Sequence, residues 1–280
     1  MTTPTLAATP AATPTAQAEH FHALHRTPAI LVLPNAWDAG SALLMQSLGA
    51  QAVATSSAAV AWAQGCGDGD RLPVAQLLAC AQSIARRLDV PLSMDIEGGY
   101  SEDPQAVGET VAALIDAGVV GINIEDGHGA PALLCRKIEQ ARAAAARAGV
   151  ALFINARTDV YLKGLVPPAQ RVAECLTRAA LYREAGADGL FAAGAREGRE
   201  IAALVAGTAL PLNILALAGV PAAAELQALG VRRVSAGSGI AESIYGRMAE
   251  LGRGFLQHGD GAALAAQAMN YGELNALMAR

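Results

Sequence analysis

PLSMDIEGGY at residues 91–100 and VGINIEDG at residues 120–127 are the two stretches of this sequence that decide the fold. Each begins with a short apolar run typical of a strand buried on both faces, and each places acids where the run gives way to a loop. Asp95 and Glu97 end the first run, and Glu125 and Asp126 end the second. In a barrel of parallel strands, the carboxyl ends of all strands meet on one face. We therefore expect these acids to gather there.

Carboxylates that gather in this way repel one another. Two unit charges about 4 Å apart repel by roughly 4 kcal/mol at an effective dielectric near 20. Such acids need a cation, or they must give up ionisation. An all-oxygen ligand set, without Cys or His at ligand spacing, favours Mg²⁺ (or Mn²⁺) over Zn²⁺. We predict a Mg²⁺ site with Asp95, Glu97 and Glu125 as its metal-binding residues.

Six more apolar runs share the design of these two. Four of the eight runs follow a helix-ending Gly, and three of the others have a Pro just before or at the start of the strand. Amphipathic, Ala-rich stretches with helical periodicity lie between consecutive runs. Eight strands, each followed by a helix, predict an α/β fold, a (β/α)8 TIM barrel with additional C-terminal helices. The runs are PAILVLPN (28–35), LGAQAVATS (48–56), VPLSMDIE (90–97), AGVVGINIE (117–125), GVALFINART (149–158), AGADGLFAA (185–193), LPLNILA (210–216) and LGVRRVSAG (229–237).

The 280 residues divide into three expected segments. Residues 1–18, rich in Pro, Thr and Ala, are expected to be a disordered N-terminal tail. Residues 19–256 are expected to form the barrel domain, and residues 257–280 a C-terminal helical extension. A closed barrel does not need that extension, so we expect it to pack on a neighbouring subunit or on the outside of the barrel. The expected assembly is a homo-oligomer, a dimer or tetramer joined through the C-terminal helices.

Composition excludes several classes of function. The net charge is −5 and the basic residues are scattered, which argues against a nucleic-acid partner. No apolar stretch of 18 residues lacks a charge or turn signal, so no membrane span is expected. The four cysteines form no CxxC pair and are expected to be reduced thiols of a cytoplasmic protein.

Polar residues occur at the ends of at least six of the eight runs, which is hard to attribute to folding alone. Simpler roles remain open for some of them: Asp38 could cap the next helix, and Asp126 and Asp159 could be capping or supporting groups. His20, His22 and His25 share one expected helix, where a solvated face is the simpler interpretation. The run-end residues are Asn35, Trp37, Asp38, Ser56, Ser57, Asp95, Glu97, Glu125, Asp126, Arg157, Asp159 and Asn213.

Five motifs in order resemble one known family. PNAWDAGSA, ATSSAAVAWAQGCGDGD, MDIEGGY, INIEDG and INARTDVYL are similar to motifs of the isocitrate lyase/phosphoenolpyruvate mutase superfamily, and the likeness runs from about residue 20 to 250. The resemblance implies a Mg²⁺ site and a pocket for a small 2-oxo-acid-like carboxylate, in which enolate charge is stabilised.

The resemblance also implies roles for individual residues. Asp95 matches the acid that contacts the metal directly, and Asp68, Glu97 and Glu125 match acids that act largely through metal-bound water. Asp68 lies in the Gly-rich segment GCGDGD, twelve residues after Ser56, where the family has a closing lid. The implied catalytic residues are Arg157, Asp68 and Glu125. The implied substrate-binding residues are Trp37, Ser56, Ser57, Arg157 and Asn213.

The departures from the family bear on the reaction. The lyase motif K-[KR]-C-G-H is absent after the fourth run, and Cys135 falls inside an expected helix, where it is interpreted as a packing residue. The lysine and histidine of the mutase branch are missing too. We therefore expect a Mg²⁺-dependent C–C bond lyase or decarboxylase that acts on a small 2-oxo or 2-hydroxy (di)carboxylate through an enolate. The alternatives are a phosphoenolpyruvate- or phosphonopyruvate-type mutase or hydrolase, or a barrel that binds dicarboxylates without turnover.

Overall fold

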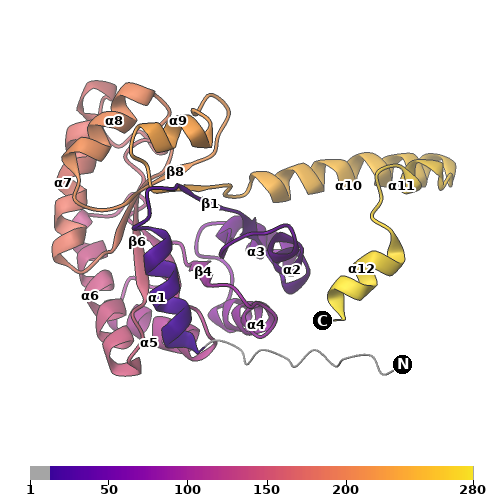
Figure 1. Cartoon of the computed structure of the whole chain (residues 1–280), viewed down its shortest axis with the longest axis horizontal. Coiled ribbons are helices and arrows are strands. Elements are labelled where there is room, and N and C mark those ends of the chain that lie inside the picture. Colours follow the sequence, from indigo (N-terminus) through magenta and orange to yellow (C-terminus); the bar gives the residue numbers. More distant parts are fainter. Residues whose placement is uncertain (1–12, 280) are drawn as a thin grey trace, which may run out of the picture.

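The computed structural model describes residues 13–279 and shows a parallel sheet with helices around it (Figure 1). The strand order is β1-β9-β8-β7-β6-β5-β4-β3-β2, and every pair is parallel. The strands are β1 (Leu31–Leu33), β2 (Asn35–Ala36), β3 (Val53–Thr55), β4 (Leu92–Asp95), β5 (Gly121–Glu125), β6 (Phe153–Thr158), β7 (Gly189–Ala192), β8 (Leu212–Leu215) and β9 (Arg233–Ser235).

β1 and β2 are two parts of one strand, and they close the sheet into a barrel. Pro34, which has no N–H, separates them. β1 pairs with β9 on one side, whereas β2 pairs with β3 on the other. The Asn35 side chain also bridges this point, because it donates to Thr55 O at 2.7 Å and accepts from Gly237 N at 2.8 Å. All eight predicted runs therefore form the barrel, and the predicted fold class is confirmed.

Helices cover the outside of the barrel, and most begin or end at the signals that the sequence contains. Asp38 caps α2 through a capping box with Ser41, which confirms the simpler role considered for it. Gly149 ends α6 in the left-handed conformation. The helices are α1 (Pro14–Leu24), α2 (Ala39–Ser47), α3 (Ser57–Ala63), α4 (Val74–Ala85), α5 (Pro104–Asp116), α6 (Pro131–Ala148), α7 (Arg171–Glu184), α8 (Gly198–Gly207), α9 (Ala223–Ala228), α10 (Gly239–His258), α11 (Ala262–Ala265) and α12 (Tyr271–Met278), with one 3₁₀ turn at Pro168–Gln170.

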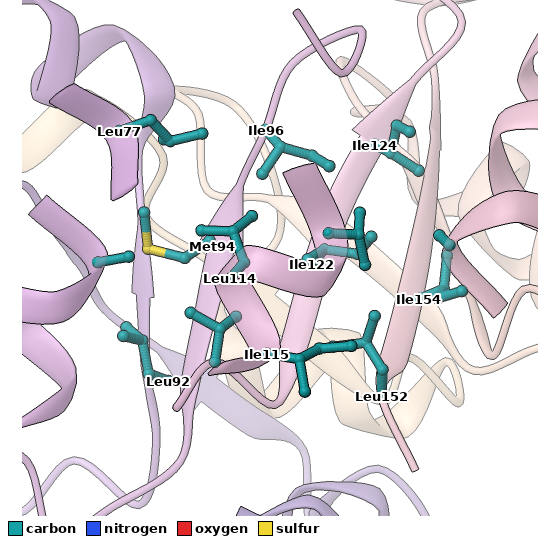
Figure 2. Close-up of a cluster of buried hydrophobic side chains, with 14 of the residues drawn as sticks. Leu77, Leu92, Met94, Ile96, Leu114, Ile115, Ile122, Ile124, Leu152 and Ile154 are labelled. Atoms are coloured by element: carbon teal, nitrogen blue, oxygen red, sulfur yellow. The ribbon is translucent and has the colours of Figure 1, made fainter. Parts of the chain in front are cut away.

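The main core lies between the outer face of the sheet and these helices. Figure 2 shows part of it, where Met94 and Ile122 of β4 and β5 lie beside Leu114 of α5. Few aromatic side chains take part, as the composition requires. The core therefore fixes β4, β5 and β6, whose carboxyl ends hold most of the acids discussed below.

Helix α1 closes the amino-terminal end of the barrel. Phe21 is fully buried against Gly121, where a Cβ atom would lie 2.5 Å from its ring. His25 is also buried and stacks on Phe153 at a centroid distance of 3.9 Å. The expectation of a solvated histidine face is therefore wrong for His25. Residues 1–12 of the expected tail lie outside the described residues, but from Pro14 the chain is helical, so the tail boundary at residue 18 is wrong.

Helix α10 leaves the barrel as a long rod, and the chain returns through α11 and α12 (Figure 1). α12 contacts α2 of the barrel, and Met278 O accepts from Arg87, which follows α4, at 2.7 Å. The boundary expected between residues 256 and 257 is wrong, because it falls inside α10. Among the helices of residues 13–279, none is long and apolar enough to cross a membrane.

Candidate active site

Asp95 lies at the carboxyl end of β4 and is held from one side only. Its Oδ2 accepts hydrogen bonds from Ser57 N at 3.1 Å and from Ser57 Oγ at 2.9 Å. Its Oδ1 is buried and has no hydrogen-bond partner among residues 13–279. Ser56 caps α3, because its Oγ accepts from Ala59 N, and this cap places Ser57 at the first turn beside Asp95. The predicted pair Ser56–Ser57 therefore orients the carboxylate of Asp95.

The side chain of Arg157, on β6, forms ion pairs with two acids. Its guanidinium pairs with Glu125 Oε2 at 2.7 Å and with Asp159 Oδ1 at 2.7 Å. Burial raises the pKa of Glu125 to about 8, although Arg157 opposes that shift. Lys163 supplies a second cation for Asp159 at 3.1 Å. Arg157 thus lies near the carboxyl end of β6, where it balances two acids, and its role toward a substrate stays a prediction.

Asp126 is a buried acid that follows β5, and its side chain is held mainly by α7. Its Oδ2 accepts from Arg178 at 2.8 Å and from the Tyr182 hydroxyl at 2.6 Å, both on α7. Its Oδ1 accepts from Asp159 N at 2.9 Å, which ties the end of β5 to the end of β6. A buried acid with three donors is fully satisfied. The supporting role considered for Asp126 is therefore the one that the structure has.

Glu97 joins the loop after α3 to the loop after β4. Its Oε2 accepts from Gly69 N at 2.8 Å and from Asp70 N, and its Oε1 accepts from the Tyr100 hydroxyl at 3.2 Å. Glu97, Asp70 and Tyr100 all have positive φ angles, a strained conformation for residues other than glycine. Burial raises the pKa of Glu97 to about 7, and Asp68 adds to the shift. The loop expected to be a mobile lid is thus fastened to Glu97 in this structure.

A cavity of about 310 Å³ opens beside the mouth, between the loops that follow β4 and β5. Lys137 of α6 lines it and is almost fully buried, with its Nζ donating to Gly98 O at 2.7 Å. The loop between β5 and α6 is only five residues long, so little chain covers the cavity. The other polar residues of its lining are Asp70, Glu97, Glu102, Glu125, Asp126, His128 and Lys163.

A layer of polar side chains fills the barrel one inward-facing position below the mouth. Asn155 donates to Asn123 Oδ1 at 2.9 Å, and Arg233 donates to the same oxygen at 3.2 Å. Asn213 is also buried, at 1% exposure, and its Oδ1 accepts from Ser235 Oγ at 3.3 Å, while its predicted part in substrate binding stays a prediction. The sequence interpretation missed Arg233, although a charged residue inside the apolar run LGVRRVSAG was a detectable signal.

The site fits a divalent cation held mainly by one carboxylate. Among residues 13–279, no three His, Cys, Asp or Glu side chains stand close enough to hold one ion together. Asp95, Glu97 and Glu125 therefore do not converge on one point in this arrangement, and their assignment as metal-binding residues stays a prediction. Asp95 Oδ1 is nevertheless a buried carboxylate oxygen without a hydrogen-bond partner among residues 13–279. The acids Glu97 and Glu125 at the neighbouring strand ends also offer oxygen ligands, the type that Mg²⁺ prefers. Asp68 is close enough to act on the charge of Asp95, as an acid acting through water would be.

Trp37 and Cys135 both pack against the main core. Trp37 is partly buried against the core, and its carbonyl accepts from Cys80 Sγ at 3.4 Å. Cys135 packs on the core from α6, and burial raises the pKa of its thiol. All four cysteines are free.

Comparison with known proteins finds one family. The pattern described as phosphoenolpyruvate phosphomutase matches residues 21–256. An uncharacterised protein of Mycobacterium tuberculosis is 38% identical over 222 residues, which cover 78% of this chain and 81% of the relative. A solved structure from Burkholderia cenocepacia, described provisionally as a phosphonomutase, is 41% identical with a TM-score of 0.80 and covers 85% of this chain and 99% of that one.

More distant relatives carry names of different reactions. 2-Methylisocitrate lyase of Bacillus subtilis is 29% identical over 183 residues, 62% of this chain and 58% of the relative. The structure of phosphonopyruvate hydrolase in complex with oxalate and Mg²⁺ is 22% identical, with a TM-score of 0.82, over 94% of this chain and 95% of that one. That last likeness shows the fold alone. Lyases, hydrolases and mutases thus share this architecture.

Proposed function

Since the chain belongs to the isocitrate lyase/phosphoenolpyruvate mutase superfamily, we propose that it is a Mg²⁺-dependent lyase or decarboxylase of small 2-oxo or 2-hydroxy (di)carboxylates. The observation that carries the proposal is the unpartnered Oδ1 of Asp95, which lies at the same mouth as the Arg157 guanidinium. A cation and an arginine on one face suit a substrate carboxylate with a neighbouring oxygen that becomes negative during bond cleavage.

Each residue has a proposed part. Asp95 would hold Mg²⁺ directly, with Asp68, Glu97 and Glu125 acting through water. When bound, Mg²⁺ would supply Lewis-acid stabilisation of negative charge on the substrate oxygens. Ser57 keeps Asp95 oriented through its N–H and its hydroxyl.

Arg157 is the proposed partner of the substrate carboxylate or oxyanion. Its Nε and one terminal nitrogen already pair with acids, so the other terminal nitrogen is the donor that we assign to the substrate. Glu125 and Asp159 fix the orientation of the guanidinium plane, which keeps that donor aimed without further loss of side-chain entropy.

The short connection between β5 and α6 favours a reaction without a cysteine as proton donor at that point. The segment from Asp126 to Ala130 contains no cysteine, and Cys135 is packed on the core. Decarboxylation of a 2-oxo dicarboxylate meets this condition, because water can protonate the enolate. The second candidate is phosphonate chemistry, which the Burkholderia cenocepacia relative favours by its description.

A substrate panel tests the proposal. The purified protein would be assayed with 2-oxo acids, 2-alkylmalates and phosphonopyruvate, with Mg²⁺ and after exhaustive chelation. We expect turnover of a (di)carboxylate that disappears on chelation and with Asp95→Asn, whereas Asp68→Asn keeps Mg²⁺ affinity within about tenfold and lowers kcat. Turnover of phosphonopyruvate alone would favour the second candidate. Undiminished activity without metal would refute the proposal.

The same proposal includes a homo-oligomer built through the C-terminal helices. α10 carries one buried residue, Ala241, along its 20 residues, and several large apolar side chains on α10–α12 are exposed. An exposed apolar patch of this kind is typical of a protein interface. The exposed residues are Ile244, Met248, Phe255, Leu256, Leu264, Met269, Tyr271 and Leu274.

A further inference from the structure

Arg233 is the largest side chain that is fully buried in the barrel, at 1% exposure. It points inward from β9, and within the described part of the chain it makes one hydrogen bond, which it donates across the barrel to Asn123 Oδ1 on β5. Its Nε and its other terminal nitrogen have no partner. None of its three nitrogens therefore meets a carboxylate among residues 13–279. A buried guanidinium without a counter-charge is strongly unfavourable for stability.

The position of Arg233 relates it to the mouth. Asn123, which receives its hydrogen bond, is the register partner of Asp95 on β4 and lies two residues before Glu125 on β5. The guanidinium thus lies in the polar layer directly beneath the acids of the candidate site. Burial lowers the pKa of Arg233 to about 9, and the charge of Asp95 opposes that shift, so the two side chains act on each other through the barrel interior.

Among residues 13–279, the cations around the mouth already have partners there, since Lys137 lines the neighbouring cavity and its Nζ donates to Gly98 O. Arg157 forms ion pairs with Glu125 and Asp159, and Lys163 also pairs with Asp159. Asp95 has no ion-pair partner there, and Glu97 is held by neutral donors. An anionic substrate approaching these acids is repelled unless a cation lies close beneath them.

We propose that Arg233 is a positioning residue that places a fixed positive charge under the site. This charge strengthens the binding of an anionic (di)carboxylate and weakens the binding of the divalent cation. This inference rests on the proposed function. It explains why the fold tolerates an unpaired charge in its interior, as strained or unfavourable groups are tolerated at functional sites. Because the charge acts at a distance, its removal has opposite effects on ligands of opposite sign.

That reversal of sign is the test. Arg233→Met has similar length without the charge, and binding of Mg²⁺ alone and of oxalate in the presence of Mg²⁺ would be measured by calorimetry. We expect Mg²⁺ to bind about three- to tenfold more tightly and oxalate about tenfold more weakly. The melting temperature should rise by several degrees, because an unpaired buried charge is replaced by an apolar group. Arg233→Lys should keep both affinities within about threefold of the wild type.

Arg232→Met is the matched control. Arg232 is the preceding residue, and it contacts Thr27 O and Pro28 O at the opposite end of the barrel. The control changes the net charge equally, so unchanged affinities there would exclude a general charge effect. Should Arg233→Met not fold, Arg233→Gln gives the same readout.

Two outcomes would overturn the inference. One is that Arg233→Met changes only the melting temperature and leaves both affinities within twofold, which would make Arg233 a structural residue. The other is that both affinities weaken together, as they would in a distorted site. A wild-type protein that binds neither Mg²⁺ nor oxalate would instead refute the proposed function, so the two failures are distinguishable.

Discussion

At the scale of single residues, Arg157 is the side chain whose two roles can be separated. We predict that Arg157→Lys lowers kcat/KM by a factor that corresponds to a loss of about 2–4 kcal/mol of transition-state stabilisation. A lysine cannot pair with two acids and still present a planar donor to a carboxylate. Steady-state kinetics and thermal unfolding of the same variant measure the two roles. A destabilised protein with near-normal kcat/KM would show that Arg157 serves only Glu125 and Asp159.

His25 makes stability depend on acid pH from a position far from the mouth. Burial lowers its pKa to about 3 from an ordinary value of 6.5. The unfolded chain therefore takes up a proton on this residue before the native protein does, and stability is lost as the pH falls from about 6.5 to about 3. The loss amounts to at most about 5 kcal/mol, at about 1.4 kcal/mol for each pH unit.

Substitution of His25 tests this account. His25→Phe keeps an aromatic ring on Phe153 and removes the titrating group, so the stability of the variant should fall less steeply between pH 6.5 and pH 3. Urea unfolding at several pH values measures the slope. The exposed His20 provides the control, since His20→Phe should keep the slope of the wild type. Equal slopes for His25→Phe and the wild type would contradict the prediction.

At the scale of elements, α1 packs on the barrel because Phe21 fits against Gly121 of β5, a residue that has no side chain. We predict that Phe21→Ala costs about 3–5 kcal/mol of stability through the cavity that it leaves. Gly121→Ala should cost about 1–3 kcal/mol, because its new methyl group would meet the Phe21 ring.

The double variant shows whether the two residues act as one contact. Phe21→Ala removes the ring that the Gly121→Ala methyl group would strike, so the double variant should lose less than the sum of the single losses, by about 1 kcal/mol. Denaturant unfolding of the four proteins completes the cycle. Strict additivity would mean that Gly121 is required for a reason other than Phe21.

At the scale of the whole molecule, α10 presents large apolar side chains that stay exposed to solvent in a single chain. We predict that the protein sediments as a dimer or tetramer, and that Ile244→Glu with Met248→Glu shifts it toward a monomer by placing charge in the apolar patch. Gln257→Glu, an exposed change on the same helix, should leave the assembly intact. A wild-type protein that sediments as a monomer at micromolar concentration would contradict the proposal.

The order of elements follows from the sequence alone, because local signals determine it. Gly after a helix, Pro before a strand and the alternation of apolar runs with amphipathic stretches are short-range features. They predicted all eight barrel strands, the cap at Asp38 and the helix that contains Cys135. The motif order predicted the family, and the rule that strands end on one face predicted that Asp95, Glu125 and Arg157 gather there.

Only the tertiary structure decided which partners these side chains have. Asp126 and Glu125 are adjacent in sequence, yet one turns to Arg178 on α7 and the other to Arg157 on β6, because successive residues of a strand face opposite sides. Arg233 reads as one of two arginines in a strand, and its role depends on the closure of the barrel, which brings β9 opposite β5. These contacts join residues that are 32, 52 and 110 positions apart in the sequence, and no local pattern encodes them.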